Sequence, residues 1–273
     1  MFHSAESNLK PRARGQAPAK PRLNGIDRVL ATLTEVARHP RGVRLDELAR
    51  SLSSPKSSVH RALGALRRSG FVTHDERGDY RLGLEFMRLA FDHYQGMDER
   101  ALIDPLLREL SARFGETAHF AKLDGSEVVY VGIVAPGGAI IMSSTIGGRN
   151  PAHLTAVGKA LLMHALPDAA AASRFVKEHG PLQRRTPTSI TEAAALAREL
   201  DASRKRGYAV DREEGERGVN CLAIPVFLGP TAPPIGAVSI SGLVARTPLT
   251  VLVKAVPEMK AIVRRHLGEA AVS

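Results

Sequence analysis

The sequence has no tryptophan, one cysteine and only 4% aromatic residues, although 44% of its 273 residues are hydrophobic. A single cysteine excludes an internal disulfide framework and favours a reducing compartment. No apolar run is long enough to span a membrane, and the basic residues 1–22 lack the apolar core of a signal peptide. We therefore expect a cytoplasmic protein, away from the membrane, whose core consists of Ala, Val, Leu and Ile.

Residues 42–82 show the order of elements of a winged helix-turn-helix. A short helix with apolar residues at Leu45 and Leu48 is followed by a turn at 51–54 and a second helix at about 55–69. Two strands follow, at 71–73 and 80–82, with the sequence DERGD between them as a turn. An earlier helix from Ile26 to about Arg38 is expected to complete the core through Val29, Leu30, Leu33 and Val36.

The helix at 55–69 combines a buried stripe with a basic face. Ser54 is expected to be its N-cap, Pro55 its first residue, and Gly70 its end. Short hydroxyls and cations on its polar face suit entry into a major groove, with contacts to phosphates and base edges. The predicted DNA-contacting residues are Lys56, Ser57, Ser58, His60, Arg61, Arg68 and, at the tip of the wing, Arg77. Arg61 is the best candidate for reading a guanine.

The distribution of charge favours double-stranded DNA as a partner. Residues 1–96 contain 17 Lys and Arg against 10 Asp and Glu, a net charge of +7, whereas residues 97–273 contain 21 against 18, a net charge of +3. The alternative is that these charges are the solvated face of an ordinary helical domain. Their concentration on a helix-turn-helix pattern is the electrostatic footprint expected of a duplex-binding protein.

The remainder of the chain predicts a second domain in which one sheet face is unusual. Strands are expected near 117–123, 127–134, 139–145, 219–227 and 235–242, and helices near 155–165 and 192–206. In the last two strands large apolar side chains alternate with small or polar ones, among them Cys221, Ser239 and Ser241. Such a face leaves room for a small anion. The alternative is that small residues accommodate a closely packed helix or a subunit contact.

A helix expected at 84–95 connects the two domains. Its apolar residues Leu84, Met87 and Phe91 lie on one side, and a second copy of the chain is the simplest partner for that side. The alternative is that the stripe packs on its own wing. The predicted organisation is a disordered basic tail at 1–22, a DNA-binding domain at 23–83, a linker helix at 84–96 and a second domain at 97–273.

Four segments resemble the IclR family of bacterial transcriptional regulators in sequence, order and spacing. They are SPKSSVHRALGALRRSGFV, HLTAVGKALLMHALP, RGYAVDREEGERGVNCLAIPVF and AVSISGLVAR. The resemblance implies an α+β protein, in which an N-terminal winged helix is joined by a linker helix to a GAF-like effector-binding domain. It also implies a homodimer or a dimer of dimers, and an effector that is a small carboxylate or an aromatic acid.

The same resemblance implies the residues that hold the effector. Asp211, Cys221, Ser239 and Ser241 match positions that contact a small acid in similar regulators. The segments that wall the pocket contribute Met142, Leu154, Ala156 and Gly158. Because Asp211 is itself a carboxylate, an acidic ligand beside it requires a neutralising proton, cation or water. The turn LGPTAPPIG and the continuation GLVAR depart from the family pattern, and both bear on ligand identity.

Three other functions are compatible with parts of the sequence. An enzyme with Cys221 as nucleophile requires a nearby histidine, for which His119, His153 and His164 are candidates. Zinc bound by Cys221, Asp211 and a histidine is a second alternative, and a nucleoid-like DNA binder without an effector is a third. No local signature supports an enzyme, and ligands so widely spread are not a zinc signature. We expect a regulator that is not an enzyme and carries neither cofactor nor metal.

Overall fold

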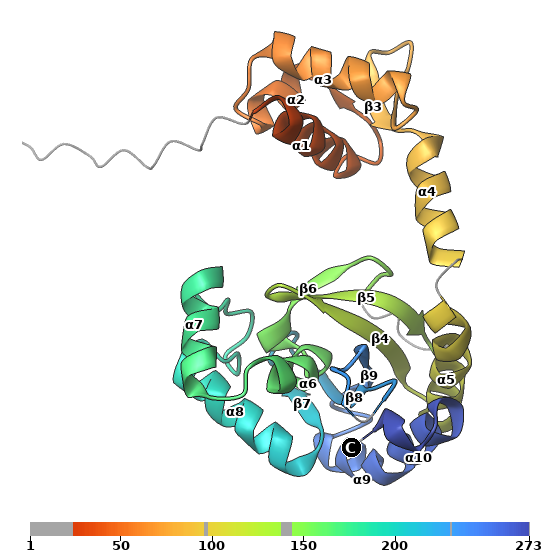
Figure 1. The fold of residues 1–273 in the computed structure, drawn as a ribbon, viewed down its shortest axis with the longest axis vertical. Coiled ribbons are helices and arrows are strands. Elements are labelled where there is room, and N and C mark those ends of the chain that lie inside the picture. The colour runs from red at the N-terminus through yellow and green to blue at the C-terminus, as the bar shows by residue number, and fades with distance from the viewer. Residues whose placement is uncertain (1–23, 96–97, 138–143, 230, 273) are drawn as a thin grey trace, which may run out of the picture. The chain divides into compact units, whose positions relative to one another are not determined.

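The structure is a computed structural model that describes residues 24–95, 98–137, 144–229 and 231–272. By its contacts the chain divides after Gly96 into two compact units. The elements of the first unit are α1 (Gly25–Ala37), β1 (Val43–Arg44), α2 (Leu45–Ser51), α3 (Lys56–Arg68), β2 (Val72–His74), β3 (Asp79–Leu82) and α4 (Leu84–Gln95). They form the predicted winged helix-turn-helix followed by one further helix (Figure 1). The predicted basic tail at 1–22 lies outside the described residues.

The core of the first unit lies between its three small helices and its sheet. Val59, Leu63 and Leu66 of α3 are buried, as their spacing predicts, and they pack with residues of α1, α2 and the wing. The expectation for Leu30 is wrong, because its side chain is 59% exposed. Two polar residues of the same helix, Thr32 and Glu35, are buried, and the Ser51 hydroxyl donates to Glu35 at 2.6 Å.

The start of α3 differs from the prediction by one residue. Pro55 has extended backbone and precedes the helix, and its carbonyl accepts from the N–H groups of Ser58 and Val59. Ser54 is therefore not the N-cap, and its hydroxyl donates to the Leu52 carbonyl at 3.1 Å. The sheet also has a strand that the pattern did not predict, because β1 pairs with β3 in the order β1-β3-β2.

The second unit is a six-stranded antiparallel sheet with helices on both faces. Its elements are α5 (Asp98–Phe114), β4 (Thr117–Asp124), β5 (Glu127–Val134), β6 (Arg149–Pro151), a 3-10 turn (Ala152–Leu154), α6 (Ala156–Ala165), α7 (Ala169–His179), α8 (Ala193–Arg206), β7 (Ala209–Arg212), β8 (Val219–Val226), β9 (Gly236–Leu243), α9 (Leu249–Lys254), α10 (Val256–Leu267) and a last 3-10 turn (Glu269–Ala271). The strand order is β6-β5-β4-β9-β8-β7. Most of the strand predicted at 139–145 lies outside the described residues.

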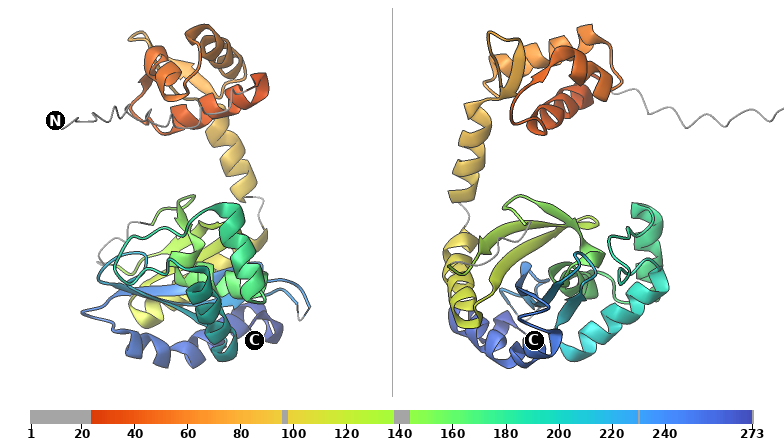
Figure 2. Two further views of the ribbon diagram at one scale, coloured as in Figure 1. Left: turned by 90° about the vertical axis from the view of Figure 1, so that its left-hand side faces the viewer. Right: turned by 180° about the vertical axis from the view of Figure 1, so that it is seen from behind.

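The two faces of this sheet are packed differently. Leu222, Ile224 and Val226 of β8 join the core with α5, α9 and α10, as their alternation predicts. On the other face Ala223 and Ala237 pack against α6, with α8 behind it, and α7 and α8 lie side by side (Figure 2). The alanines of the small-residue face therefore accommodate a close helix, which is one of the two alternatives that the sequence left open. In the described part of the chain no helix has both the length and the apolar character to cross a membrane.

Candidate functional site

The helix α3 presents the predicted DNA-contacting residues to solvent. Lys56, Ser57, His60, Arg61 and Arg68 are exposed, and Ser58 is half-buried next to the buried Val59. The Lys56 ammonium lies 2.8 Å from an Asp46 carboxylate oxygen of α2, and both side chains are more than 60% exposed. A phosphate would compete with Asp46 for this ammonium, because exposed ion pairs of this kind are weak.

The wing places the seventh predicted DNA-contacting residue at its tip. Arg77 is exposed, and its backbone N–H donates to the Asp75 carboxylate, which also accepts from the Asp79 N–H at the same distance of 3.0 Å. Gly78 closes the turn with φ +86°, a conformation that L side chains rarely adopt. These bonds form the turn predicted from DERGD, and they fix the backbone that carries the guanidinium.

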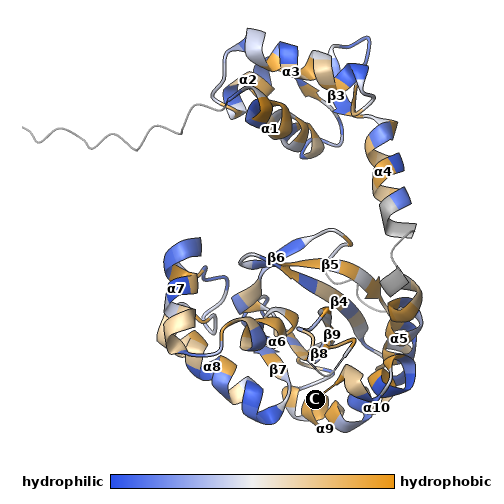
Figure 3. Ribbon diagram, viewed as in Figure 1, coloured by the Kyte–Doolittle hydropathy of each residue, from blue (hydrophilic) through white to orange (hydrophobic). Residues whose placement is uncertain are grey.

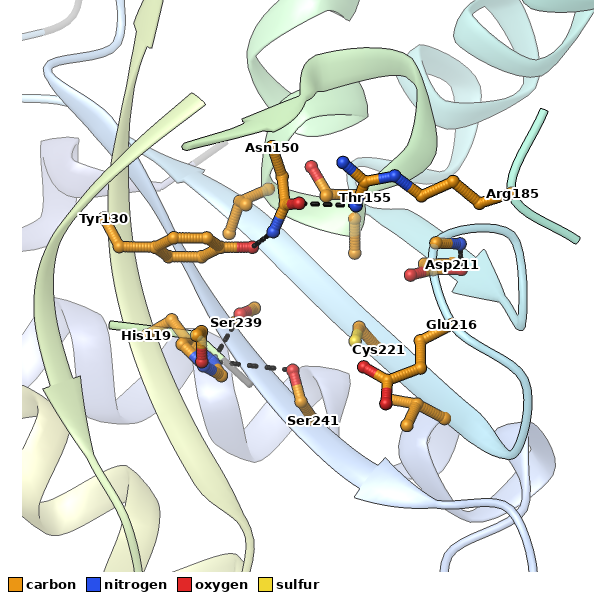
Figure 4. Close-up of a pocket in the computed structure, with 15 residues that line it drawn as sticks. His119, Tyr130, Asn150, Thr155, Arg185, Asp211, Glu216, Cys221, Ser239 and Ser241 are labelled. Carbon is orange, nitrogen blue, oxygen red and sulfur yellow. Dashed lines mark hydrogen bonds between the residues drawn. The ribbon is translucent and has the colours of Figure 1, made fainter. Parts of the chain in front are cut away.

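A pocket of about 90 Å³ lies on the small-residue face of the sheet, beside the first turn of α6 (Figure 4). Ser239 and Ser241 of β9, Cys221 of β8 and Asp211 of β7 line it, as does Ala156 of α6. The sequence pattern grouped Cys221 with the two serines on one face, and the register pairs Cys221 with Ser241.

Helix α6 points its N-terminus into this pocket. The Thr155 side chain caps the helix by accepting from the Gly158 N–H at 3.0 Å, and the Thr155 carbonyl accepts from the Lys159 N–H. The N–H groups of Ala156 and Val157 then have no partner among the described residues, as expected for the first turn of a helix. Both residues line the pocket. Free N–H groups at the positive end of a helix dipole form a binding site for an anion.

Hydrogen bonds between His119 and three serines define one wall of the pocket. His119 of β4 contacts Ser144 at 2.8 Å through Nε2, and Ser239 and Ser241 at 3.5 Å through Nδ1 (Figure 4). Burial lowers the pKa of His119 to about 4, so its ring is neutral at pH 7. The wall thus offers hydroxyl groups and a neutral imidazole.

A cation stands at the mouth of the pocket. Arg185 donates to the Asn150 amide oxygen at 2.6 Å, and the Asn150 amide donates to the Tyr130 hydroxyl at 3.4 Å. Burial raises the pKa of Tyr130 to about 12, so its hydroxyl keeps its proton. These three residues and His119 line the pocket. The sequence indicated His119 only as a candidate partner for a Cys221 nucleophile, and it did not indicate the other three. The recognisable signal for this part of the site was Thr155, which precedes the apolar run at 156–163 and is a typical N-cap residue.

Asp211 is the buried carboxyl of the pocket. Its Oδ1 accepts from the N–H groups of Glu214 at 2.7 Å and Gly215 at 3.4 Å. Burial nevertheless raises its pKa from the ordinary 3.8 to about 7, with the nearby Lys159 opposing the shift and Glu214 adding to it. Near neutral pH a large fraction of Asp211 is therefore protonated. A protonated carboxyl is the neutralising partner that an acidic ligand requires here.

A fully buried ion pair supports this region from behind. The Lys159 ammonium of α6 lies 2.6 Å from both carboxylate oxygens of Glu214, and the two side chains are 0% and 4% exposed. The Glu214 carbonyl also accepts from the hydroxyls of Thr186 and Ser189. The turn after β7 is thereby bonded both to α6 and to the segment that carries Arg185.

Two of the predicted effector residues, Leu154 and Gly158, do not line this pocket. Leu154 is fully buried in the 3-10 turn before α6. Gly158 faces the backbone, because a Cβ added to it would lie 2.1 Å from the Ala152 carbonyl oxygen. The HLTAVGK segment serves mainly to pack α6, and only its central residues line the cavity. Met142 lies outside the described residues.

The geometry gives no support to a cysteine nucleophile or a zinc site. Burial raises the pKa of the Cys221 thiol, which disfavours the thiolate. The His119 nitrogens bond to serines, His153 contacts the Gln183 carbonyl, and His164 packs on Phe227. Among the described residues no group of three or more His, Cys, Asp or Glu side chains is placed to hold a metal ion.

Comparison with known proteins agrees with both halves of this arrangement. Residues 25–76 match the IclR helix-turn-helix domain, and residues 92–265 match the bacterial transcriptional regulator IclR C-terminal domain. The transcriptional repressor IclR of Escherichia coli is 32% identical over 245 residues, which are 89% of this chain and 88% of that protein. The crystal structure of the Thermotoga maritima IclR is 29% identical, with a TM-score of 0.66 over 89% of this chain and 98% of that one.

A third comparison concerns the fold alone. An IclR homologue from Microbacterium hydrocarbonoxydans, crystallised in complex with 4-hydroxybenzoate, has a TM-score of 0.71 at 22% identity over 89% of this chain and 100% of that one.

A helix-turn-helix unit followed by a domain with a polar ligand pocket defines a transcription regulator with separate DNA-binding and effector domains. The chain belongs to the IclR family of bacterial transcriptional regulators. Its relatives in other bacteria are transcriptional regulators as well.

Proposed function

We propose that this regulator binds operator DNA through α3 and its wing, and that a small organic acid in the pocket of the second unit changes that binding. One arrangement carries the proposal. Ala156 and Val157 with their free N–H groups, Ser239 and Ser241 with their hydroxyls, and Arg185 with its guanidinium all line one small cavity. These donors suit a carboxylate, because charged acceptors form the stronger hydrogen bonds.

The size of the cavity favours a short acid. Its volume of about 90 Å³ is smaller than the roughly 150 Å³ of an engineered apolar cavity that holds benzene. An acid of two to four carbon atoms fits better than an aromatic acid. Because one homologue was crystallised in complex with 4-hydroxybenzoate, a ligand screen should compare short acids with aromatic acids.

Asp211 determines the protonation state in which the acid binds. A ligand carboxylate next to an ionised Asp211 would bring two like charges together in a buried site, which is unfavourable. With its pKa raised to about 7 by burial, Asp211 can keep its proton and donate it in a hydrogen bond to the ligand. The acid therefore binds as an anion to the protein with neutral Asp211.

On the DNA side, the predicted DNA-contacting residues of α3 divide by chemistry. Lys56, Ser57, Ser58 and Arg68 contact phosphates, while His60 and Arg61 reach base edges in the major groove. Arg77 contacts the phosphate backbone from the wing. The exposure of these groups, apart from the half-buried Ser58, supports the assignment, and loss of sequence specificity in Arg61→Ala tests it.

A second copy of the chain is the proposed partner of α4. Leu84 is 85% exposed, Met87 44% and Phe91 51%, and the apolar residues Phe86 and Leu89 are also exposed (Figure 3). So much uncovered apolar surface on one helix is unusual in a monomer. A homodimer covers it, and each dimer then carries two copies of α3 for two half-sites. Met87→Glu should produce monomers in sedimentation experiments.

A thermal-shift screen tests the effector proposal. Acetate, glyoxylate, pyruvate and succinate are compared with benzoate and 4-hydroxybenzoate, because a bound ligand raises the apparent stability by mass action. We expect a short acid to raise the melting temperature, and Ser239→Ala with Ser241→Ala to abolish the rise. Lys177→Met, an exposed change on α7, is the control. An equal rise in the serine variant would place the acid elsewhere.

A further inference from the structure

A second and larger cleft lies at the other end of α6. Its volume is about 580 Å³, within the range of 300 to 1,000 Å³ that is usual for small-molecule sites. The end of β4, the last turns of α6 and the segment that joins β8 to β9 form its walls. The described residues 231–235 of that segment line the cleft, and its sequence, LGPTAPPIG, departs from the family pattern.

The walls of this cleft are largely apolar. Leu123 of β4 and Leu161 of α6 contribute aliphatic surface, and Phe227 and Pro234 contribute rings. The His164 ring meets the Phe227 ring edge-on, with centroids 5.2 Å apart at 84°. Two rings held at a right angle form a corner against which an aromatic ligand can pack.

Lys122 is the one Lys or Arg side chain among the described residues that line this cleft, and none of those residues is Asp or Glu. Burial and the nearby Arg204 guanidinium lower the pKa of His164, so its imidazole is neutral at pH 7. Arg204 itself donates to the carbonyls of Met163 and Leu166 at the end of α6, at 2.8 and 2.9 Å.

We propose that this cleft is a second ligand site, which takes an aromatic organic anion. The rings and aliphatic walls receive the apolar body, and the Lys122 ammonium attracts the acid group. The volume of this cleft accommodates a ligand body of one or two rings, whereas the pocket at the other end of α6 has a volume of only about 90 Å³. The site does not depend on the effector proposed above, since the two cavities share no lining residue.

The absence of tryptophan makes a direct test possible. In the full-length variant Phe227→Trp the only tryptophan stands in the wall of the cleft. Titration with 1-anilinonaphthalene-8-sulfonate should give saturable energy transfer from this tryptophan to the probe. In the same background Lys122→Met should weaken probe binding at least threefold, and Ala165→Leu, which narrows the cleft, should weaken it further. Lys177→Met, on exposed α7, should leave it unchanged.

Competition identifies the ligand class. 2-Naphthoate should displace the probe at a concentration at least threefold lower than 2-naphthamide, which has a similar body without the charge. The double change Ser239→Ala with Ser241→Ala should not alter the titration. Equal binding in Lys122→Met and Lys177→Met, or loss of binding in the serine variant, overturns the proposal. The proposal is also overturned if probe binding disappears at the protein concentrations at which sedimentation shows that the chain oligomerises, because the cleft would then be a subunit contact.

Discussion

The substitution Asp211→Asn should stabilise the protein in a pH-dependent way. The folded carboxyl has a pKa of about 7 because it is buried, whereas its ordinary value is 3.8. The unfolded chain therefore releases the proton at a lower pH than the folded chain, and unfolding becomes easier as the pH rises from about 4 to about 7. Asparagine preserves the shape and the oxygen that accepts from Glu214 N–H, but it carries no charge at any pH.

The size of the effect follows from these two pKa values. One pKa unit corresponds to about 1.4 kcal/mol, so ionising buried Asp211 costs about 4 kcal/mol at pH 8 and about 1.5 kcal/mol at pH 5. The stability of the wild type relative to Asp211→Asn should accordingly fall by about 2 to 3 kcal/mol between pH 5 and pH 8. The stabilising contribution of the protonated carboxyl is present below pH 4 and is lost as the pH rises through 7.

Urea unfolding followed by circular dichroism at pH 5, 6, 7 and 8 measures this difference. Asp201→Asn is the matched control, because Asp201 is exposed on α8 beside Lys205 and its pKa is lowered by that partner. Its effect should be small and nearly independent of pH in this range. The assignment of a raised pKa to Asp211 would be refuted if the difference in unfolding free energy between Asp211→Asn and the wild type did not change with pH. It would also be refuted if Asp211→Asn stabilised the protein more at pH 5 than at pH 8.

Three further predictions concern binding and the buried ion pair. If the acid binds the protein with neutral Asp211, its affinity measured by calorimetry should fall about tenfold from pH 6 to pH 8. Asp211→Asn should remove this pH dependence. A stronger affinity at pH 8 than at pH 6 would contradict binding to neutral Asp211. Lys159→Met should destabilise the protein by about 3 to 5 kcal/mol in urea unfolding, because it leaves Glu214 buried without its partner, and a loss below 1 kcal/mol would show that the pair is not buried in solution. Arg61→Ala should weaken binding to a selected duplex by about 1 to 3 kcal/mol in fluorescence anisotropy, while non-specific binding stays nearly unchanged. Arg67→Ala is the control. Equal losses of affinity for the selected duplex in the two variants would show that Arg61 does not recognise a base.

The elements of the first unit could be predicted closely because their signals are local. The spacing of Val59, Leu63 and Leu66 and the glycine after α3 depend only on neighbouring residues, and all are seen in the structure. Ser54 was misassigned because Pro55 occupies the cap position in extended backbone, so the serine side chain turns back to Leu52. The strand β1 is two residues long and exists only through its pairing with β3, which no periodicity reveals.

The pocket could be predicted only where strand alternation operates. Cys221, Ser239 and Ser241 share a face because side chains alternate along paired strands. Arg185 and Asn150 reach the same cavity from loops and from the short strand β6, and their meeting depends on tertiary packing. Asp211 came from family resemblance, and its raised pKa depends on burial that the sequence alone does not show.

The dependence of operator affinity on the acid tests the proposed function most directly. Anisotropy of a labelled duplex, selected from random sequences with the full-length protein, gives the Kd with and without the acid that stabilises the protein most. For the wild type the acid should change the Kd by about 5 to 150-fold, the usual range of allosteric coupling. Ser239→Ala with Ser241→Ala should bind the duplex as the wild type does without acid and show no change when it is added. A wild-type response in this variant, or an unchanged wild-type Kd at saturating acid, would contradict the proposal that this pocket controls DNA binding.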